Sequence, residues 1–138
     1  MKNKLLKCNI GEYAVILNNK KEILILLLKA TKKYPKEKWM LPGGRLGIDD
    51  QPEQGLKREI FEETGLKVKV ITPCHTARWG SENPPKYVVF YLCKLMGSQK
   101  IRLNHEHIDY KWISFKDISK ISFHNINSKL AIKKANKK

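Results

Sequence analysis

The feature that most constrains the fold of this sequence is a segment with helical spacing that carries three glutamates. Pro52 suits the first turn of a helix, and Gly65 suits the left-handed residue that ends one. Between them, Glu59, Glu62 and Glu63 stand at positions i, i+3 and i+4, so a helix projects all three carboxylates from one face. Carboxylates this close repel one another, and we therefore expect a positive partner at this face.

A divalent cation is the partner that this pattern indicates. Mg²⁺ and Mn²⁺ take oxygen ligands, which a carboxylate triplet supplies while the metal removes the repulsion. Arg58 precedes the triplet and is placed to orient carboxylates through hydrogen-bonded pairing. Leu56, Ile60 and Phe61 give the helix apolar positions at helical spacing, and Leu56 and Ile60 lie on the face opposite the acids, toward the core. The alternative interpretation of the acidic face is an ordinary solvated helix surface.

The rest of the chain contains β-rich runs on both sides of this helix. We expect one hairpin, in which an Asn of residues 18–21 takes positive φ, and a turn or loop at residues 42–44. Strands on both sides of one long helix predict a mixed sheet layered between helices. The predicted strands are 12–17, 22–29, 39–41, 67–79 with a break near Pro73, 87–96 and 109–114. A polar loop is predicted at 80–86. Two shorter helices are predicted, one from Ser114 or Phe115 to Ile121 and one from Asn127 or Ser128 onward.

The residues before and within the helix follow a fixed spacing. Gly44 is followed by five residues, Asp50, seven residues and then the run Arg-Glu-Ile-Phe-Glu-Glu-Thr-Gly-Leu at 58–66. This spacing resembles the signature of the Nudix hydrolase family, MutT-like nucleotide pyrophosphohydrolases, and every fixed position matches except Asp50, where the family has Glu. Residues 39–44 are also similar to the family's usual approach to this signature. The resemblance implies the α/β Nudix fold, an α/β/α sandwich around a mixed sheet.

The same resemblance implies an activity and a set of site residues. Family members use water to hydrolyse a nucleoside diphosphate linked to another moiety, here a nucleoside triphosphate or a diphosphate-linked nucleotide. The expected metal is Mg²⁺, with Mn²⁺ as an alternative. The resemblance places the metal on Glu59, Glu62, Glu63 and backbone carbonyls around Gly43 and Gly44, with Arg58 orienting Glu59 or its neighbours.

Five further residues have more than one interpretation. Glu62 and Glu106 are competing candidates for the general base, and Glu106 is alternatively an exposed loop residue. Arg45 and Arg78 are candidates for binding substrate phosphates or, equally, solvated or core residues. Trp79 is a candidate for stacking on a base or, as we favour, a residue of the core or surface.

Asp50 departs from the family pattern because its side chain is one methylene shorter than Glu. Its role in bracing the loop or touching the metal is therefore open, and Asp49 or Glu53 are alternatives for that role. If the shorter side chain weakens the bracing, Asp50→Glu should leave the activity equal or higher.

The charge of the chain raises the question of an RNA partner. Its 28 Lys and Arg against 13 Asp and Glu give a formal charge of +15, which attracts phosphates and nucleic acids. However, 24 of the 28 cations are Lys, and the chain is also rich in Ile and Asn, as an AT-rich coding sequence would make any protein. We therefore expect a small nucleotide as the partner and do not favour RNA. The alternatives are an RNA 5′-end pyrophosphohydrolase and a non-catalytic module that binds nucleotide or RNA.

Length and apolar pattern predict one domain over residues 1–138, with a loose N-terminus and a Lys-rich C-terminal tail. The longest apolar run, residues 23–28, is far shorter than the roughly 20 residues that span a bilayer. Three cysteines at irregular spacing indicate reduced thiols and neither a zinc site nor a disulfide framework. We expect a soluble, cytoplasmic protein without a membrane partner. The sequence does not indicate the base, the second moiety or the oligomeric state.

Overall fold

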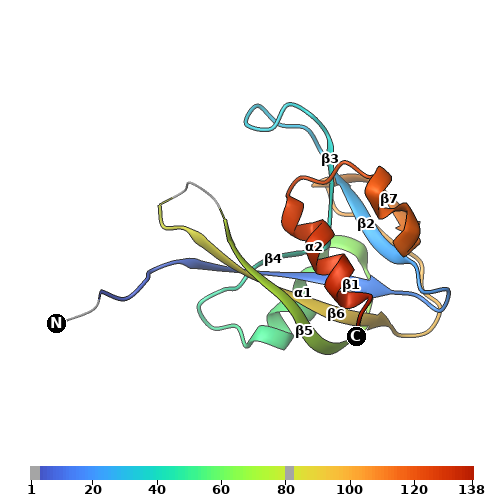
Figure 1. Cartoon of the computed structure of the whole chain (residues 1–138), viewed down its shortest axis with the longest axis horizontal. Coiled ribbons are helices and arrows are strands. Elements are labelled where there is room, and N and C mark those ends of the chain that lie inside the picture. Colours follow the sequence, from blue (N-terminus) through green and yellow to red (C-terminus); the bar gives the residue numbers. More distant parts are fainter. Residues whose placement is uncertain (1–3, 80–82) are drawn as a thin grey trace.

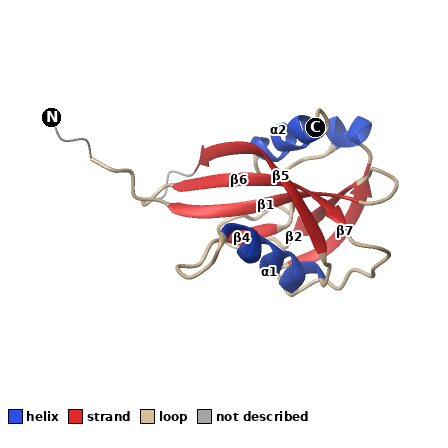
Figure 2. Ribbon diagram, turned by 90° about the horizontal axis from the view of Figure 1, so that it is seen from below, coloured by secondary structure: helices blue, strands red, loops and turns tan. Residues whose placement is uncertain are grey.

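The structure is a computed structural model that describes residues 4–79 and 83–138. Its elements form a twisted β-sheet with helix α1 on one face and helix α2 on the other (Figure 1, Figure 2). This arrangement confirms the predicted α/β sandwich. The elements are β1 (Asn9–Leu17), β2 (Ile23–Leu28), β3 (Lys38–Met40), β4 (Gly43–Arg45), α1 (Pro52–Thr64), β5 (Val68–Trp79), β6 (Lys86–Leu95), β7 (His107–Ile113), the 3₁₀ helix η1 (Phe115–Lys120) and α2 (Ile126–Ala135).

The sheet is mixed, as the sequence predicts. Its strand order is β3-β2-β1-β6-β5, with β4 paired to β1 and β7 paired to β2. Strands β1 and β6 run parallel from Asn9↔Lys86 to Leu17↔Lys94, whereas the other pairs are antiparallel. This topology brings β4 and α1 close to the carboxyl-terminal half of the chain, where Glu106 lies.

Alternation along β1 divides the core between the two faces of the sheet. Ala14 and Ile16 belong to the cluster that buries Leu56 and Ile60 of α1, whereas Val15 belongs to the cluster under α2. Leu56 and Ile60 are fully buried, as predicted, whereas Phe61, the third apolar residue of the helix, is 46% exposed. It stands next to Ile60 and so points about 100° away from the buried stripe of the helix.

The predicted hairpin between β1 and β2 is present but short. The two strands pair antiparallel at Leu17↔Ile23, beside the turn. Beyond this pair, β4 takes the same edge of β1 at Gly11–Tyr13, and β3 takes the same edge of β2 at Leu26–Leu28. Positive φ occurs at Lys21, not at an Asn. Asn18 closes the turn with its side chain instead, since its Oδ1 accepts the backbone N–H groups of Lys20 at 3.0 Å and Glu22 at 2.9 Å.

Most other predicted elements are present with small changes of boundary. Helix α1 begins with Pro52 and ends at Gly65, which has φ 73°, as predicted. Residues 43–45 form a short strand instead of a turn or loop. The break near Pro73 is confirmed by irregular pairing of β5 with β6, and α2 begins at Ile126 under an Asn125 cap. Of the predicted loop 80–86, residues 80–82 lie outside the described part, and Lys86 already belongs to β6.

Within the described residues, no helix is long and apolar enough to cross a membrane.

Candidate active site

Two glycines of β4 bring the backbone against the carboxylates of α1. The Gly43 N–H donates to Glu63 Oε1 at 2.8 Å. A Cβ on Gly43, which has φ 150°, would lie 2.1 Å from the Glu12 carbonyl oxygen, and one on Gly44 would lie 2.6 Å from Glu59 Oε2. Side chains at these positions would therefore push β4 away from β1 or from α1.

Glu63 is a buried carboxyl group with neighbours of its own sign. Its side chain is 7% exposed. Burial raises its pKa from 4.5 to about 8, against the lowering effect of the Gly43 hydrogen bond, and repulsion from Glu59, Glu106 and Glu62 raises it further. The environment of Glu63 is therefore unfavourable for a carboxylate until a positive charge arrives.

The three glutamates of α1 do not share one environment. Glu59 and Glu63 line the same cavity, whereas Glu62 is not among the described residues that line it. The Glu62 side chain is 57% exposed, and its Oε1 lies 3.6 Å from Nε of Arg58. The predicted triplet therefore separates into two cavity-lining acids and one on the surface.

Arg58 joins the helix to the loop that precedes it. It binds both carboxylate oxygens of Asp50, with Nη2 at 2.8 Å from Oδ2, and Nη2 also lies 3.3 Å from Glu59 Oε1. Asp50 accepts the Gly47 N–H at 2.7 Å as well. These contacts lower the pKa of Asp50, chiefly through Arg58 and then Gly47. Asp50 thus braces the loop despite its shorter side chain, while Asp49 is exposed.

A loop before β7 docks on the end of α1. The backbone N–H of Asn104 donates to the Glu63 carbonyl at 3.1 Å. Asn104 Oδ1 accepts from the Glu106 backbone N–H at 3.2 Å and from His107 Nδ1 at 3.1 Å. An amide oxygen only accepts, so the Glu106 N–H and His107 Nδ1 both donate to it. Asn104 thereby holds the Glu106 backbone and the His107 ring in place relative to each other.

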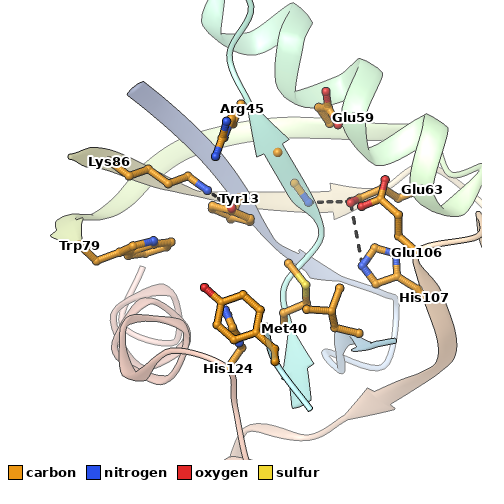
Figure 3. A pocket seen from close by; sticks show the side chains of 14 residues that line it. Tyr13, Met40, Arg45, Glu59, Glu63, Trp79, Lys86, Glu106, His107 and His124 are labelled. Atoms are coloured by element: carbon orange, nitrogen blue, oxygen red, sulfur yellow. Dashed lines mark hydrogen bonds and ion pairs between the residues drawn. The ribbon is translucent and has the colours of Figure 1, made fainter. Parts of the chain in front are cut away.

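These elements enclose a cavity of about 350 Å³ with two chemically different walls (Figure 3). One wall carries the acids. The other carries aromatic rings, with ring centroids of Tyr13 and Trp79 at 5.8 Å and of Tyr34 and His124 at 4.8 Å. The acidic wall consists of Glu59, Glu63 and Glu106 with His107 beside them, and Gly43 and Gly44 lie along it.

Two cationic side chains also line the cavity. Lys86 Nζ donates to the Tyr13 hydroxyl at 2.6 Å and lies 5.6 Å from the Trp79 ring centroid. Arg45, predicted as a phosphate-binding residue, lies along the same cavity. Arg78 is exposed and is not among the described lining residues, because alternation on β5 turns it away from Trp79.

Sequence reasoning missed several lining residues. Tyr13, Tyr34, Lys86 and His124 come from four separate segments, and only the sheet topology brings them together. His107 could have been predicted as a residue of the site, because it directly follows the candidate Glu106 in the sequence. Trp79, which we favoured as a core or surface residue, packs against the core and also lines the cavity.

The chemistry of the acidic wall suits a hard divalent cation. Its donors are carboxylate oxygens, and their mutual repulsion already raises the pKa of Glu63. Among the described residues, no group of three or more His, Cys, Asp or Glu side chains is already arranged to hold a metal ion. Glu59 and Glu106 would have to turn toward Glu63 for that, and Glu106 is exposed enough to do so.

Comparisons with known proteins agree on one family. Residues 11–133 match the NUDIX domain. The chain is 32% identical over 105 residues to the asymmetrical bis(5′-nucleosyl)-tetraphosphatase of Caenorhabditis elegans, covering 73% of this chain and 75% of that protein. It is 30% identical over 105 residues to an RNA pyrophosphohydrolase of Aeromonas hydrophila, covering 61% and 60%. The crystal structure of a MutT protein from Methanosarcina mazei superposes with TM-score 0.78 and 26% identity over 97% of each chain.

Proposed function

The chain belongs to the Nudix family and is a pyrophosphohydrolase of phosphoric anhydrides, and we propose that its substrates are nucleoside polyphosphates, with dinucleoside tetraphosphates as the main class. The observation that carries this proposal is the single cavity with an acidic wall, two cationic side chains and an aromatic wall. A nucleoside polyphosphate has a complementary part for each of these surfaces.

The aromatic wall is the surface that suits the base. Rings of Tyr13, Trp79 and Tyr34 offer apolar faces on which any nucleobase can stack. Lys86 and Arg45 lie along the same cavity and would bind phosphate oxygens. These side chains would hold the base and orient the polyphosphate chain toward the acidic wall.

Glu59 and Glu63 are the residues that would hold the divalent cation. When bound, Mg²⁺ would neutralise phosphate charge and acidify a water molecule. Gly43 holds the Glu63 carboxyl group through its backbone N–H, and Arg58 holds the loop through Asp50. Both contacts restrict how far the acids can move.

Glu106 is better placed than Glu62 to accept the proton of the attacking water. Glu106 lines the cavity, and its backbone is fixed through Asn104 and through a hydrogen bond from Lys29 N–H to its carbonyl at 3.0 Å. Glu62 lies outside the described lining and close to Arg58. We therefore assign the proton acceptor to Glu106, while water attacks phosphorus and the anhydride P–O bond breaks.

Dinucleoside tetraphosphates are favoured over an RNA 5′ end for two reasons. The relative named for that substrate class matches about three quarters of both chains. In addition, Arg45 and Lys86 are the cations among the described lining residues, so the lysines of this basic chain are not concentrated in the cavity.

A substrate panel tests the proposal. The panel contains a dinucleoside tetraphosphate, an oxidised and an ordinary nucleoside triphosphate, and a 5′-triphosphorylated RNA, each with Mg²⁺ and products identified by chromatography. We expect the highest kcat/KM on the dinucleoside tetraphosphate, cleaved asymmetrically to a mononucleotide and a triphosphate. A higher kcat/KM on the RNA would contradict the assignment of substrate.

A further inference from the structure

His107 has a buried ring nitrogen that the proposed chemistry has not yet used. Among the described residues, His107 Nε2 is the buried side-chain polar atom without a hydrogen-bond partner. It faces Glu63, with Nε2 4.0 Å from Oε2, and both residues line the cavity (Figure 3). A buried polar atom left unpaired costs free energy, so its retention here requires a reason.

The hydrogen bonds of the ring define what Nε2 can do. Asn104 Oδ1 also receives the Glu106 N–H, so this atom is an acceptor and His107 Nδ1 must donate its proton to it. In the neutral ring, Nε2 therefore carries a lone pair. An outer hydrogen bond at one ring nitrogen is how proteins orient metal-binding histidines.

The distance between His107 and Glu63 also suits a shared cation. Two ligand atoms that each lie about 2.1 Å from one metal ion are at most roughly 4.2 Å apart. The observed 4.0 Å falls inside this limit. Without a cation, no hydrogen bond connects His107 Nε2 to the Glu63 carboxyl group across this gap.

We propose that His107 Nε2 is a nitrogen ligand of the divalent cation, beside the carboxylate of Glu63. This inference rests on the metal dependence of the proposed function. Mg²⁺ takes oxygen ligands almost exclusively, whereas first-row transition-metal ions, Mn²⁺ the weakest binder among them, also accept an imidazole nitrogen. The nitrogen therefore shifts the preference of the site from Mg²⁺ toward Mn²⁺, relative to a site of carboxylates alone.

The first test is spectroscopic and uses the wild-type protein loaded with Mn²⁺ alone, without nucleotide. We expect electron spin-echo modulation from a directly bound ¹⁴N, which changes to the ¹⁵N pattern when the protein is made with ¹⁵N-histidine. Bound Mn²⁺ without nitrogen coupling would overturn the ligand proposal and leave the proposed function standing. Failure to bind Mn²⁺ at millimolar concentration would overturn both.

A set of variants assigns the nitrogen. His107→Gln should abolish the coupling and weaken Mn²⁺ binding roughly tenfold or more, as at sites that lose one ligand or its support, with a smaller effect on Mg²⁺. His105→Gln, in the same loop but exposed, and His124→Gln, on the aromatic wall, are the matched controls. Coupling that survives in His107→Gln and disappears in His124→Gln would overturn the assignment.

Discussion

Glu63 combines a structural cost with the metal-binding role that we propose for it. Its burial, and then repulsion from the acids that it faces, raise its pKa to about 8 despite the backbone hydrogen bond that it accepts from Gly43. Such an arrangement destabilises the metal-free protein and prepares a position for a cation. Its energetic effect and its catalytic effect can therefore be separated by one substitution.

Glu63→Gln should abolish most of the activity and leave the fold intact. The amide keeps the size of the side chain and an oxygen for the Gly43 N–H, but it removes a charge from the metal site. Loss of several kcal/mol of transition-state stabilisation corresponds to a decrease in kcat/KM of about a hundredfold or more. Steady-state kinetics measure the loss of activity, and circular dichroism checks that the fold is intact. A fully active variant would contradict the proposed role of Glu63.

The stability of the metal-free protein should fall as the pH rises from about 4.5 to about 8, the ordinary and the folded pKa of Glu63. In this window the folded protein holds a proton that the unfolded chain releases, so higher pH favours unfolding. Thermal unfolding in EDTA measures the effect. Glu63→Gln should flatten the dependence of Tm on pH. At pH 8 it should raise Tm by about 3–5 °C for each kcal/mol of unfavourable free energy that the buried, ionised carboxylate costs the wild-type protein. Identical pH profiles for the two proteins would show that Glu63 does not carry this penalty.

Asp50 is fitted to its loop, which reverses the expectation from the family pattern. Its carboxylate is held at hydrogen-bond distance by both Arg58 and the Gly47 N–H. An added methylene would shift the carboxylate away from these two partners, so Asp50→Glu should lower kcat/KM by roughly 10–100-fold, as the loss of a supporting contact does. Asp49→Asn, an exposed neighbour, is the control. Equal or higher activity of Asp50→Glu would restore the original expectation.

At the scale of elements, β4 positions the site because it lies between β1 and α1. Gly43→Ala and Gly44→Ala should therefore have different effects. A Cβ at 43 would meet backbone atoms, 2.1 Å from Glu12 O and 2.7 Å from Tyr13 Cα, whereas one at 44 would meet only the Glu59 side chain. We expect Gly43→Ala to lower Tm strongly, and Gly44→Ala to keep Tm but lose roughly 10–100-fold in kcat/KM by displacing Glu59. The reverse order of effects would contradict this account of β4.

Local elements were the most predictable from the sequence. Helix α1 carries its start at Pro52 and its end at Gly65 in its own residues, so its bounds follow from spacing alone. The short hairpin between β1 and β2 was predictable for the same reason, whereas the pairing of β1 with β6, and of β2 with β7, depends on residues distant in sequence. The same limitation explains the site: the acids of α1 could be read from the sequence, but the second wall needed the complete topology.

At the scale of the whole molecule, the charge of +15 should contribute little to hydrolysis of a small nucleotide. Replacing Lys133, Lys137 and Lys138 by Gln should change kcat/KM by less than about twofold, because none of the three is among the described lining residues. Lys134 is left in place because its Nζ lies 2.9 Å from His75 Nδ1. Lys86→Gln, inside the cavity, is the contrasting variant and should lower kcat/KM.

The same lysine variant tests for an RNA partner. Each phosphate contact to a single strand contributes a slope of about −0.7 to log affinity against log salt. We expect no tight RNA binding near 0.15 M salt, and the lysine variant should leave the weak binding almost unchanged. Sub-micromolar affinity with a steep slope that the variant reduces would instead favour the RNA 5′ end as substrate.

The most direct test of the central claim, that one cavity brings a metal-binding wall to a bound nucleoside polyphosphate, is a Mg²⁺ titration of dinucleoside tetraphosphate hydrolysis. The protein is first stripped with EDTA, and wild type and Glu63→Gln are compared at equal concentration. We expect wild-type activity to rise from background to saturation with Mg²⁺ while the variant stays near background. Full turnover without any divalent cation, or the same titration curve for both proteins, would contradict the account.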